Sequence, residues 1–312
     1  MRKSVYFNHD AGVDDLVSLL MLLESPEVEL IGVGDVPADS YLEPGVAASQ
    51  KIINRFGKNK QLTVAASTAK TNDPFPKEWR MDSFTVDALP ILNEFGTGEV
   101  QIANQPAHLD LVDKLMAADE PVTLLFTGPL SDLAAALDVN PAIEAKIARL
   151  YWMGGTFGVG NIAEPEQDNT AEWNAFWDPQ AVKRVWDTQI EIDMVALEST
   201  HQVPLTNADR LRWAKQRQYV GLDFIGQGYA IVPTLTHFET NSTYFLWDVL
   251  TTAHMLNPTL TKTKVVNCDV ITTGQSRGRT FVTPTGRPVN FVYDVNHDAF
   301  FEFLEMVIKR AQ

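Results

Sequence analysis

Short apolar runs alternate with segments of helical periodicity through the first two thirds of the chain, and this alternation constrains the fold most. Runs such as residues 5–7, 28–33 and 122–126 are almost continuously apolar, as are strands buried on both faces of a parallel sheet. Between them, apolar residues recur at helical spacing. Strands joined by crossover helices form a parallel sheet with helices on both faces. The sequence therefore predicts an α/β fold with a mostly parallel, open sheet.

The expected elements follow one another along the chain in the same order. We expect strands at residues 5–7, 28–33, 62–66, 122–126, 147–152 and 190–195, and helices at 14–23, 41–56, 108–117, 130–137 and 179–185. The pattern turns helical from 209 to 258, and residues 265–272 and 279–282 indicate a late β pair. Two long interruptions, 68–104 and 157–177, have the length of functional loops. Without a linker or repeat, residues 1–312 are expected to form a single domain with a helical elaboration in the C-terminal third.

The charge balance argues against two classes of function. The 312 residues include 40 Asp and Glu against 25 Lys and Arg, a net charge of −15. Such an acidic surface repels nucleic acids and anionic membranes, whereas a divalent cation or a neutral ligand suits it. No apolar run is long enough to span a bilayer, and no signal peptide is recognised. The single cysteine, Cys268, is expected to be an inert buried thiol, and the expected location is the cytoplasm.

Three acidic residues follow the first predicted strand, within Asn8-His9-Asp10-Ala11-Gly12-Val13-Asp14-Asp15. In open α/β sheets, ligands bind at the carboxyl ends of the strands. Clustered carboxylates repel one another unless a cation lies among them, and oxygen ligands suit Ca²⁺ or Mg²⁺. Gly12 would permit a tight backbone there. Alternatively, Asp14 and Asp15 simply enrich the first turn of a helix, where the macrodipole favours acids. This segment alone leaves both interpretations open.

Further motifs follow the later strand ends. They are Phe126-Thr127-Gly128-Pro129-Leu130, Trp152-Met153-Gly154-Gly155, Asn161, Glu172-Trp173-Asn174 and Trp247-Asp248. Together and in this order, they resemble the nucleoside hydrolase family over essentially the whole chain. That family opens with Asp-x-Asp-x-Gly-x-Asp-Asp, which this chain matches except at Asn8.

Within that family, the chain looks most like the purine-preferring, inosine-adenosine-guanosine branch. The closer match lies in Phe75-Pro76-Lys77-Glu78-Trp79-Arg80, in Ala171-Glu172-Trp173-Asn174, in Trp177-Asp178-Pro179 and in Trp247-Asp248-Val249-Leu250-Thr251. Other branches typically have His where Trp247 stands. The resemblance implies a Rossmann-like domain that hydrolyses the N-glycosidic bond of ribonucleosides to ribose and free base.

The resemblance also implies roles for individual residues. Ca²⁺ would be held by the carboxylates of Asp10, Asp15 and Asp248 and by the backbone carbonyl of Thr127, with Asp10 also the general base. The ribose would be bound by Asp14, Asn161, Glu172 and Asn174, with Met153 packing nearby. Trp79 and Trp247 would enclose the purine, and Asp39 would lie near it. Because relatives are dimers or tetramers, a homo-oligomer is expected.

These residue types suit that chemistry. Carboxylates stabilise the positive charge that develops on the sugar, and a metal ion activates water. Aromatic rings favour a protonated leaving base through cation–π attraction. Each residue also has a plainer interpretation: Trp79 as a loop anchor, Trp247 as core packing and Thr127 as a turn residue. His9, His237 and His254 are expected to be structural.

The chain departs from the family pattern at three places. Asn8 replaces the first acid and so removes one negative charge, and Glu198 stands where Asp is usual. The segment between His237 and Trp247, expected to cover the site, looks shorter and lacks an expected Arg. Asn8 motivates a second hypothesis, a nearly inactive ribonucleoside-binding protein on the same scaffold.

Overall fold

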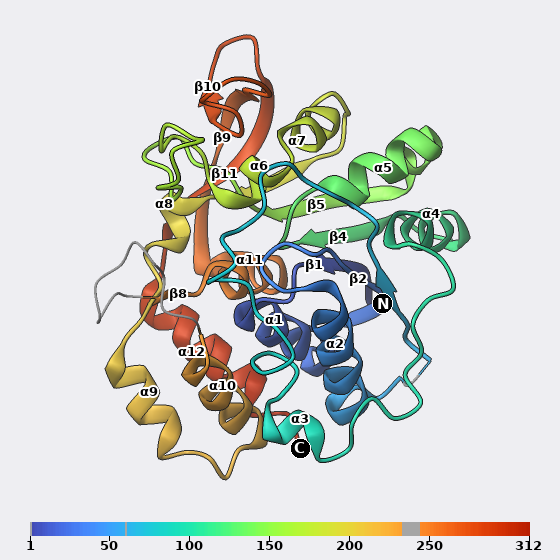
Figure 1. Ribbon diagram of the computed structural model, residues 1–312, viewed down its shortest axis with the longest axis vertical. Helices are drawn as coiled ribbons and strands as arrows, with labels where there is room; N and C mark the ends of the chain where they lie inside the picture. The colour runs from blue at the N-terminus through green and yellow to red at the C-terminus, as the bar shows by residue number, and fades with distance from the viewer. Residues whose placement is uncertain (1, 60, 233–243) are drawn as a thin grey trace.

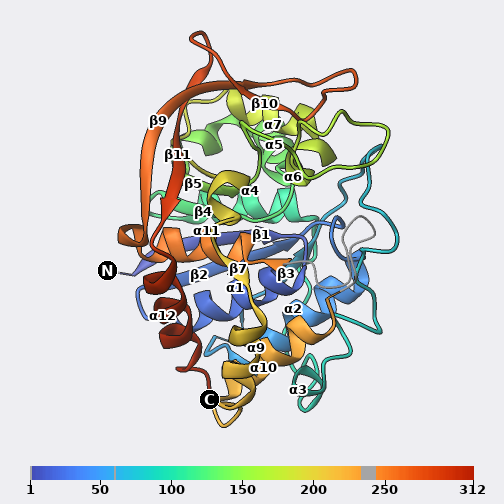
Figure 2. The ribbon, with the colours of Figure 1, turned by 90° about the vertical axis from the view of Figure 1, so that its left-hand side faces the viewer.

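The fold is built around a central twisted sheet with helices on both faces, as the sequence predicts (Figures 1 and 2). The computed structural model describes residues 2–59, 61–232 and 244–312. Its nine-stranded sheet has the order β10-β9-β11-β6-β5-β4-β1-β2-β3. The neighbouring strands β11, β6, β5, β4, β1, β2 and β3 are parallel to one another. At the other end of the sheet, β9 pairs antiparallel with both β11 and β10.

The parallel strands all have their carboxyl ends along one edge of the sheet. The strands are β1 Lys3–His9, β2 Val28–Asp35, β3 Val64–Ala66, β4 Val122–Phe126, β5 Ile147–Met153, β6 Ile192–Val195, β9 Thr261–Val270, β10 Thr280–Val282 and β11 Arg287–Val295. A separate antiparallel pair joins β7 Pro204–Leu205 to β8 Tyr244–Phe245.

Each face of the sheet carries its own apolar core and its own helices (Figure 2). One face is covered by α1 Val13–Glu24, α2 Leu42–Phe56, α10 Val220–Ala230, α11 Trp247–Leu256 and α12 His297–Ile308, and the other by α4 Ala107–Ala117, α5 Ser131–Val139 and α7 Pro179–Trp186. The shorter helices are α3 Pro90–Asn93, α6 Trp173–Trp177, α8 Leu197–Thr200, α9 Asn207–Ala214 and the 3₁₀ turns η1 Pro141–Lys146 and η2 Pro258–Leu260. Among the described residues, no helix has both the length and the apolar character needed to cross a membrane.

The strands and helices predicted between residues 5 and 195 are found, with two additions at the C-terminal end of the chain. The stretch predicted as helical, 209–258, contains α9, α10 and α11 but also the short strand β8, and its residues 233–243 lie outside the described part of the chain. The late β pair, 265–272 and 279–282, corresponds to β9 and β10. Strand β11 and helix α12 follow this pair and were not predicted.

The first helix, α1, also differs from a simple amphipathic helix. All but one of the residues of α1 are buried, because α2, α11 and α12 cover the side that faces away from the sheet.

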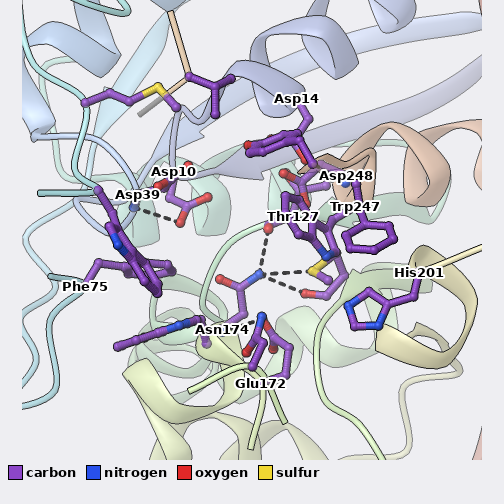
Figure 3. Close-up of a pocket in the computed structure, with 18 of the residues that line it drawn as sticks. Asp10, Asp14, Asp39, Phe75, Thr127, Glu172, Asn174, His201, Trp247 and Asp248 are labelled. Atoms are coloured by element: carbon purple, nitrogen blue, oxygen red, sulfur yellow. Dashed lines mark hydrogen bonds between the residues drawn. The ribbon is translucent and has the colours of Figure 1, made fainter. Parts of the chain in front are cut away.

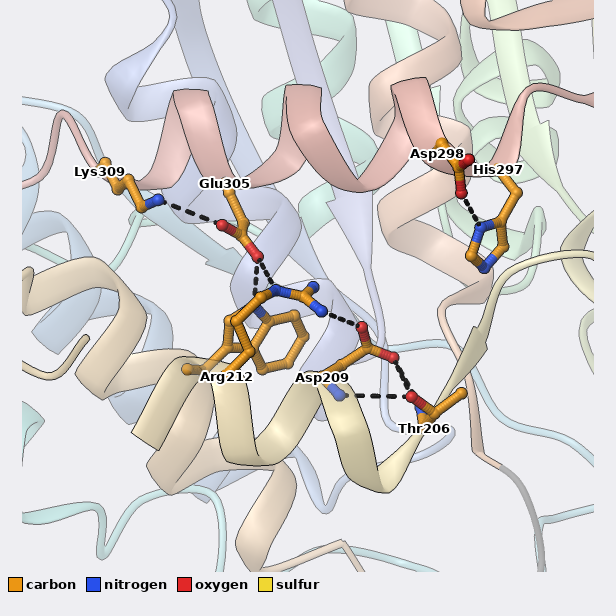
Figure 4. A network of polar contacts seen from close by, with 8 residues as sticks. Thr206, Asp209, Arg212, His297, Asp298, Glu305 and Lys309 are labelled. Atoms are coloured by element: carbon orange, nitrogen blue, oxygen red, sulfur yellow. Dashed lines mark hydrogen bonds and ion pairs between the residues drawn. The ribbon is translucent and has the colours of Figure 1, made fainter. Parts of the chain in front are cut away.

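Helix α9 is fastened to α12 by a polar network (Figure 4). Arg212 donates from Nε to Glu305 at 2.7 Å and also pairs with Asp209 at 2.8 Å. Lys309 approaches the other oxygen of Glu305 at 3.1 Å. Asp209 lies at the start of α9, where its carboxylate accepts from the Thr206 backbone. This network ties the helical elaboration to the last helix of the main domain.

Candidate active site

One cavity of about 230 Å³ lies outside the carboxyl ends of the strands (Figure 3). Residues from both halves of the chain line it: Asp10, Asp14, Asp39, Phe75, Trp79, Met81, Thr127, Met153, Gly160, Asn161, Glu172, Trp173, Asn174, His201, Val232, Tyr244, Phe245, Trp247 and Asp248. No Lys or Arg is present in this lining, as far as the structure describes the chain. The cavity therefore combines carboxylates, amides and aromatic rings without a neutralising cation.

The acidic segment between β1 and α1 is held in a tight turn. Ala11 has a left-handed φ of 60°, whereas the φ of Gly12 is an ordinary −61°. Gly12 is needed for space instead, because a Cβ there would lie 2.3 Å from Oδ2 of Asp39. The expected tight backbone is thus present, but its left-handed residue is Ala11. Asp15 accepts from the Gly12 amide at 2.8 Å and caps the first turn of α1.

The carboxylates at this strand end are buried close to one another. Asp10, Asp14, Asp15 and Asp248 are each no more than 6% exposed. Burial first, and then the charges of Asp15 and Asp39, raise the pKa of Asp10 well above its usual value. Burial and the charge of Asp15 raise the pKa of Asp14 to about 7. Burial and the charge of Asp14 raise the pKa of Asp248. Negative charge is therefore unfavourable in this cluster unless a cation joins it.

The donor set fits a hard divalent cation, although the side chains are not gathered as a ready metal centre. Carboxylates and a backbone carbonyl are the ligands that Ca²⁺ prefers. Across residues 2–59, 61–232 and 244–312, no three acidic, His or Cys side chains converge in a metal-binding arrangement. Instead, these carboxylates accept from backbone amides: Asp10 from Asp39 at 3.0 Å and Asp14 from Asp248 at 3.3 Å. The Thr127 hydroxyl donates to Asp15 at 2.5 Å, and the Thr127 carbonyl accepts from Asn174 at 2.8 Å.

Polar side chains meet at a second side of the cavity. Glu172 caps α6 and accepts from the Asn174 amide at 2.8 Å and the Gly155 amide at 2.9 Å. Burial raises the pKa of Glu172 to about 7 against the opposing effect of these amides. The Asn174 side chain also donates to the Met153 carbonyl at 3.1 Å. The buried Oδ1 of Asn161 has no hydrogen-bond partner among the described residues, so it offers an acceptor to a hydroxyl group.

Aromatic rings form two groups at the cavity, with Phe75 and Trp247 drawn on opposite sides in Figure 3. In the first group, the ring centroid of Trp173 lies 4.6 Å from that of Phe75, in a stacked arrangement, and 5.6 Å from that of Trp79, in an edge-to-face arrangement. In the second group, Trp247 lies 4.7 Å from Tyr244 and 5.8 Å from Phe245. These groups give a flat ring two aromatic surfaces to pack against.

The structure brings the predicted site residues together. All of them line the cavity except Asp15, which accepts a hydrogen bond from the lining residue Thr127. We did not predict Phe75, Met81, Trp173, His201, Tyr244 or Phe245 as lining residues. Phe75 and Trp173 stand inside motifs that carry the family resemblance. The pair Tyr244 and Phe245 forms the two-residue strand β8, which is too short to leave a periodic pattern.

Several other sequence expectations concern residues near this cavity. His9 is buried, its Nδ1 accepts from the Ala11 amide at 3.1 Å, and burial lowers its pKa to about 4. His254 is buried between Asp193 and Thr261, so both histidines have structural contacts. Cys268 is buried, and burial raises its pKa to about 11. His237 and the segment from 238 to 243, expected to cover the site, lie outside the described residues.

Comparison with known proteins shows the family and agrees with the fold. A sequence model of the inosine-uridine preferring nucleoside hydrolase family matches residues 5–302. The chain is 57% identical to the inosine-uridine preferring nucleoside hydrolase of Bacillus anthracis, with a TM-score of 0.94 over 99% of this chain and 100% of that one. A purine-preferring ribonucleoside hydrolase from Gardnerella vaginalis has the same fold, with a TM-score of 0.79 at 23% identity over 98% of each chain.

Curated relatives match over a shorter stretch. The pyrimidine-specific ribonucleoside hydrolase RihB of Escherichia coli O17:K52:H18 is 27% identical over 209 residues, which cover 66% of this chain and 63% of that protein. RihB of Escherichia fergusonii is 29% identical over 213 residues, with the same coverage. The chain thus spans about 63% of the length of the curated relatives it matches.

The fold and the site define an α/β protein whose cavity combines a cluster of buried carboxylates with hydrogen-bonded polar groups and aromatic surfaces. The family match covers residues 5–302, nearly the whole of this architecture. The chain belongs to the inosine-uridine preferring nucleoside hydrolase family.

Proposed function

We propose that this chain hydrolyses the N-glycosidic bond of ribonucleosides, with Ca²⁺ as cofactor and purine nucleosides as preferred substrates. The observation that carries the proposal is the cavity in which Asp10 and Asp14, Glu172 and Asn174, and two groups of aromatic rings all meet. Family membership supports the reaction class. The aromatic groups support the purine preference, because a two-ring base offers a larger surface for stacking.

Asp10, Asp15 and Asp248, with the Thr127 carbonyl, would hold the cation. When bound, a divalent cation supplies an activated water as nucleophile at neutral pH. Asp10 would accept the proton of the attacking water. Its Oδ2 accepts from the Asp39 amide at 3.0 Å, which fixes the carboxylate plane.

Asp14, Asn161, Glu172 and Asn174 would bind the ribose hydroxyls, with Met153 against the sugar. Glu172 and Asn174 are fixed by backbone partners before the sugar arrives, so little ordering is needed on binding. As the bond to the base breaks, positive charge develops on the sugar, and the buried carboxylates stabilise it. Trp79 and Trp247 would stack on the base, with Asp39 near it.

An assay of ribose release across inosine, guanosine, adenosine, uridine and cytidine tests the proposal. With Ca²⁺ present, we expect release from all purine nucleosides, with the highest kcat/KM for inosine or guanosine. The names of the relatives above motivate the alternative, since one is pyrimidine-specific and another prefers inosine and uridine. A higher kcat/KM for uridine than for every purine nucleoside would overturn the purine preference.

The second candidate is a nearly inactive ribonucleoside-binding protein, which Asn8 motivates. Calorimetry with inosine would show binding in both cases. Binding with no ribose release from any nucleoside, even after Asn8→Asp, would select the binding protein.

We further propose that residues 1–312 act as one cytoplasmic domain in a homo-oligomer. Light scattering behind size-exclusion chromatography is expected to show a dimer or tetramer, and a monomer at micromolar concentration would contradict the assembly.

A further inference from the structure

Arg80 lies between two residues that line the cavity, Trp79 and Met81, but is itself absent from the lining. Its guanidinium donates from Nε to the Ala38 carbonyl at 3.1 Å, and from Nη2 to the Pro37 and Ser40 carbonyls at 3.0 and 3.3 Å. These three carbonyls belong to the turn between β2 and α2. One half-buried side chain in the long 68–104 loop therefore organises a turn about forty residues earlier in the chain.

An aromatic ring completes the binding of this guanidinium. The centre of the Arg80 guanidinium lies 4.0 Å from the ring centroid of Tyr41, within the range of a cation–π contact. A planar guanidinium can stack on a ring and donate in its own plane to several carbonyls at once, whereas an ammonium is a compact point charge. The site is thus built for Arg rather than Lys.

Backbone hydrogen bonds run beside this side-chain contact. The Tyr41 amide donates to the Met81 carbonyl, and the Met81 amide donates to the Asp39 carbonyl, each at 2.9 Å. These bonds form an isolated parallel bridge between Ser40 and Met81. An isolated bridge of this size has little stability of its own, and Arg80 adds three side-chain hydrogen bonds across the same contact.

The turn formed by residues 37–41 is also hydrogen-bonded to the segment that contains Asp10 and Ala11. The Asp39 amide donates to Oδ2 of Asp10 at 3.0 Å, and the Ser40 amide donates to the Asp10 carbonyl at 2.9 Å. The Ser40 hydroxyl donates to the Ala11 carbonyl at 2.6 Å. A continuous path of hydrogen bonds therefore joins Arg80 to the carboxylate proposed as general base.

We propose that Arg80 is a positioning residue that fixes the base-facing wall, Trp79 and Met81, relative to Asp10 through the 37–41 turn. The proposal rests on the proposed function, since it assigns Arg80 to the same reaction. The positive charge of Arg80 also faces Asp39 and Asp10, and it opposes the effect of burial on the pKa of Asp39. Arg80 thus serves the reaction without touching the substrate.

Three variants test this role: Arg80→Ala, Arg80→Lys and, as a matched control, Arg184→Ala. Arg184, on α7, is another arginine held by contacts within the protein: it donates to the Asp138 carboxylate and to the Leu137 carbonyl. We expect Arg80→Ala to lower kcat for inosine by roughly 10- to 100-fold, the usual cost of a small misplacement of reacting groups. Arg80→Lys should recover only part of this loss, and Arg184→Ala should behave as wild type.

Chemical rescue separates positioning from general damage. Guanidinium chloride at low millimolar concentration should restore part of the kcat of Arg80→Ala, and methylammonium chloride should not. With p-nitrophenyl riboside, whose leaving group needs no stacking, the loss should be smaller than with inosine but still present, because Asp10 is also displaced. Wild-type kcat in Arg80→Ala, or a loss that guanidinium does not restore, would overturn the proposal.

Hydrogen exchange gives a readout that does not depend on turnover. In Arg80→Ala, the amides of Asp39, Tyr41 and Met81 should exchange faster, while the amides of β4 keep their wild-type rates. Unchanged exchange at these three amides would overturn the proposal even if the kcat of Arg80→Ala falls. If wild-type protein releases no ribose from any nucleoside, the proposed function fails, and the exchange data still decide whether Arg80 holds the turn.

Discussion

Asn8, which replaces the first acid of the family motif, does not line the cavity in the structure. It is fully buried, and its Nδ2 donates to Asp132 at 3.0 Å, while the Ser67 hydroxyl donates to the other oxygen of Asp132 at 2.7 Å. Burial raises the pKa of Asp132, and these two hydrogen bonds act against that rise. The amide at position 8 thus stabilises a buried carboxylate next to β1.

We therefore expect Asn8→Asp to destabilise the fold without raising activity. In this variant a carboxyl group takes the place of the amide that donates to Asp132, so a buried acceptor loses its hydrogen-bond partner. Such a loss lowers the free energy of unfolding by roughly 1–3 kcal/mol. Urea unfolding at pH 7.5 and ribose release from inosine would measure both effects. A variant with higher kcat than wild type would show that Asn8 does limit the reaction.

Trp247 stands at the start of α11, where it contacts Tyr244 and Phe245 and its buried Nε1 has no hydrogen-bond partner among the described residues. Stacking of a base on an aromatic ring is worth roughly 1–3 kcal/mol, and only the part that grows as the base becomes protonated raises the rate. We expect Trp247→Ala to lower kcat for inosine more than it raises KM. Turnover of p-nitrophenyl riboside should fall much less, and equal losses on both substrates would identify Trp247 as a packing residue.

At the scale of elements, the short helix α8 holds the loop that leads to Asn161. Glu198 of α8 accepts from the Phe157 and Gly158 amides at 2.7 and 2.8 Å and from the Thr156 hydroxyl at 3.0 Å. In the sequence, Glu198 stands out only as a departure from an expected Asp. The structure shows what the longer side chain does, because it reaches two successive amides across the loop.

Removing this carboxylate should loosen the loop. We expect Glu198→Ala to cost about 1–3 kcal/mol of unfolding free energy, because amides lose a charged acceptor. KM for inosine should rise more than kcat falls, since Asn161 is proposed to bind the sugar. Initial-rate kinetics and urea unfolding would measure these effects, with Glu302→Ala on α12 as the control. An unchanged KM would mean that the loop keeps its position without Glu198.

The elements of the parallel sheet were predictable from sequence because buried strands such as β4 are short, continuous apolar runs bounded by turns. We did not predict β11 and α12, since the last element expected from the periodic pattern ends at residue 282. The resemblance named most of the polar residues of the cavity and two of its aromatic residues, Trp79 and Trp247, and the fold brings them together from distant segments. The contacts of Arg80 and Asn8 were not predictable, because each depends on a partner that only the folded chain brings near.

At the scale of the whole molecule, the buried acids make stability depend on pH. The pKa of Glu172 rises from 4.5 to about 7 on folding. As the pH rises between these values, Glu172 therefore loses its proton in the unfolded chain but keeps it in the folded protein. Stability from this group is thus fully present below about pH 4.5 and is lost as the pH rises to 7, by roughly 3 kcal/mol at most. His9, whose pKa falls to about 4, acts in the opposite direction between pH 4 and 6.5.

A comparison of wild type with Glu172→Gln isolates the effect of this acid from that of His9. With chelator present, we expect wild type to lose stability relative to Glu172→Gln between pH 5 and pH 7.5, because Gln does not ionise. Unfolding free energies from urea titrations at the two pH values would measure the difference. A difference that stays constant with pH would show that Glu172 ionises as readily in the folded protein as in the unfolded chain.

The central claim of the proposed function is that a cation binds at Asp10, Asp15 and Asp248, within the carboxylate cluster at the end of β1. The most direct test measures ribose release from inosine by exhaustively chelated protein as Ca²⁺ is returned. We predict no release without the cation and a saturable recovery to full activity as Ca²⁺ is added. Full activity in the chelated protein would contradict the need for a cation at these three carboxylates.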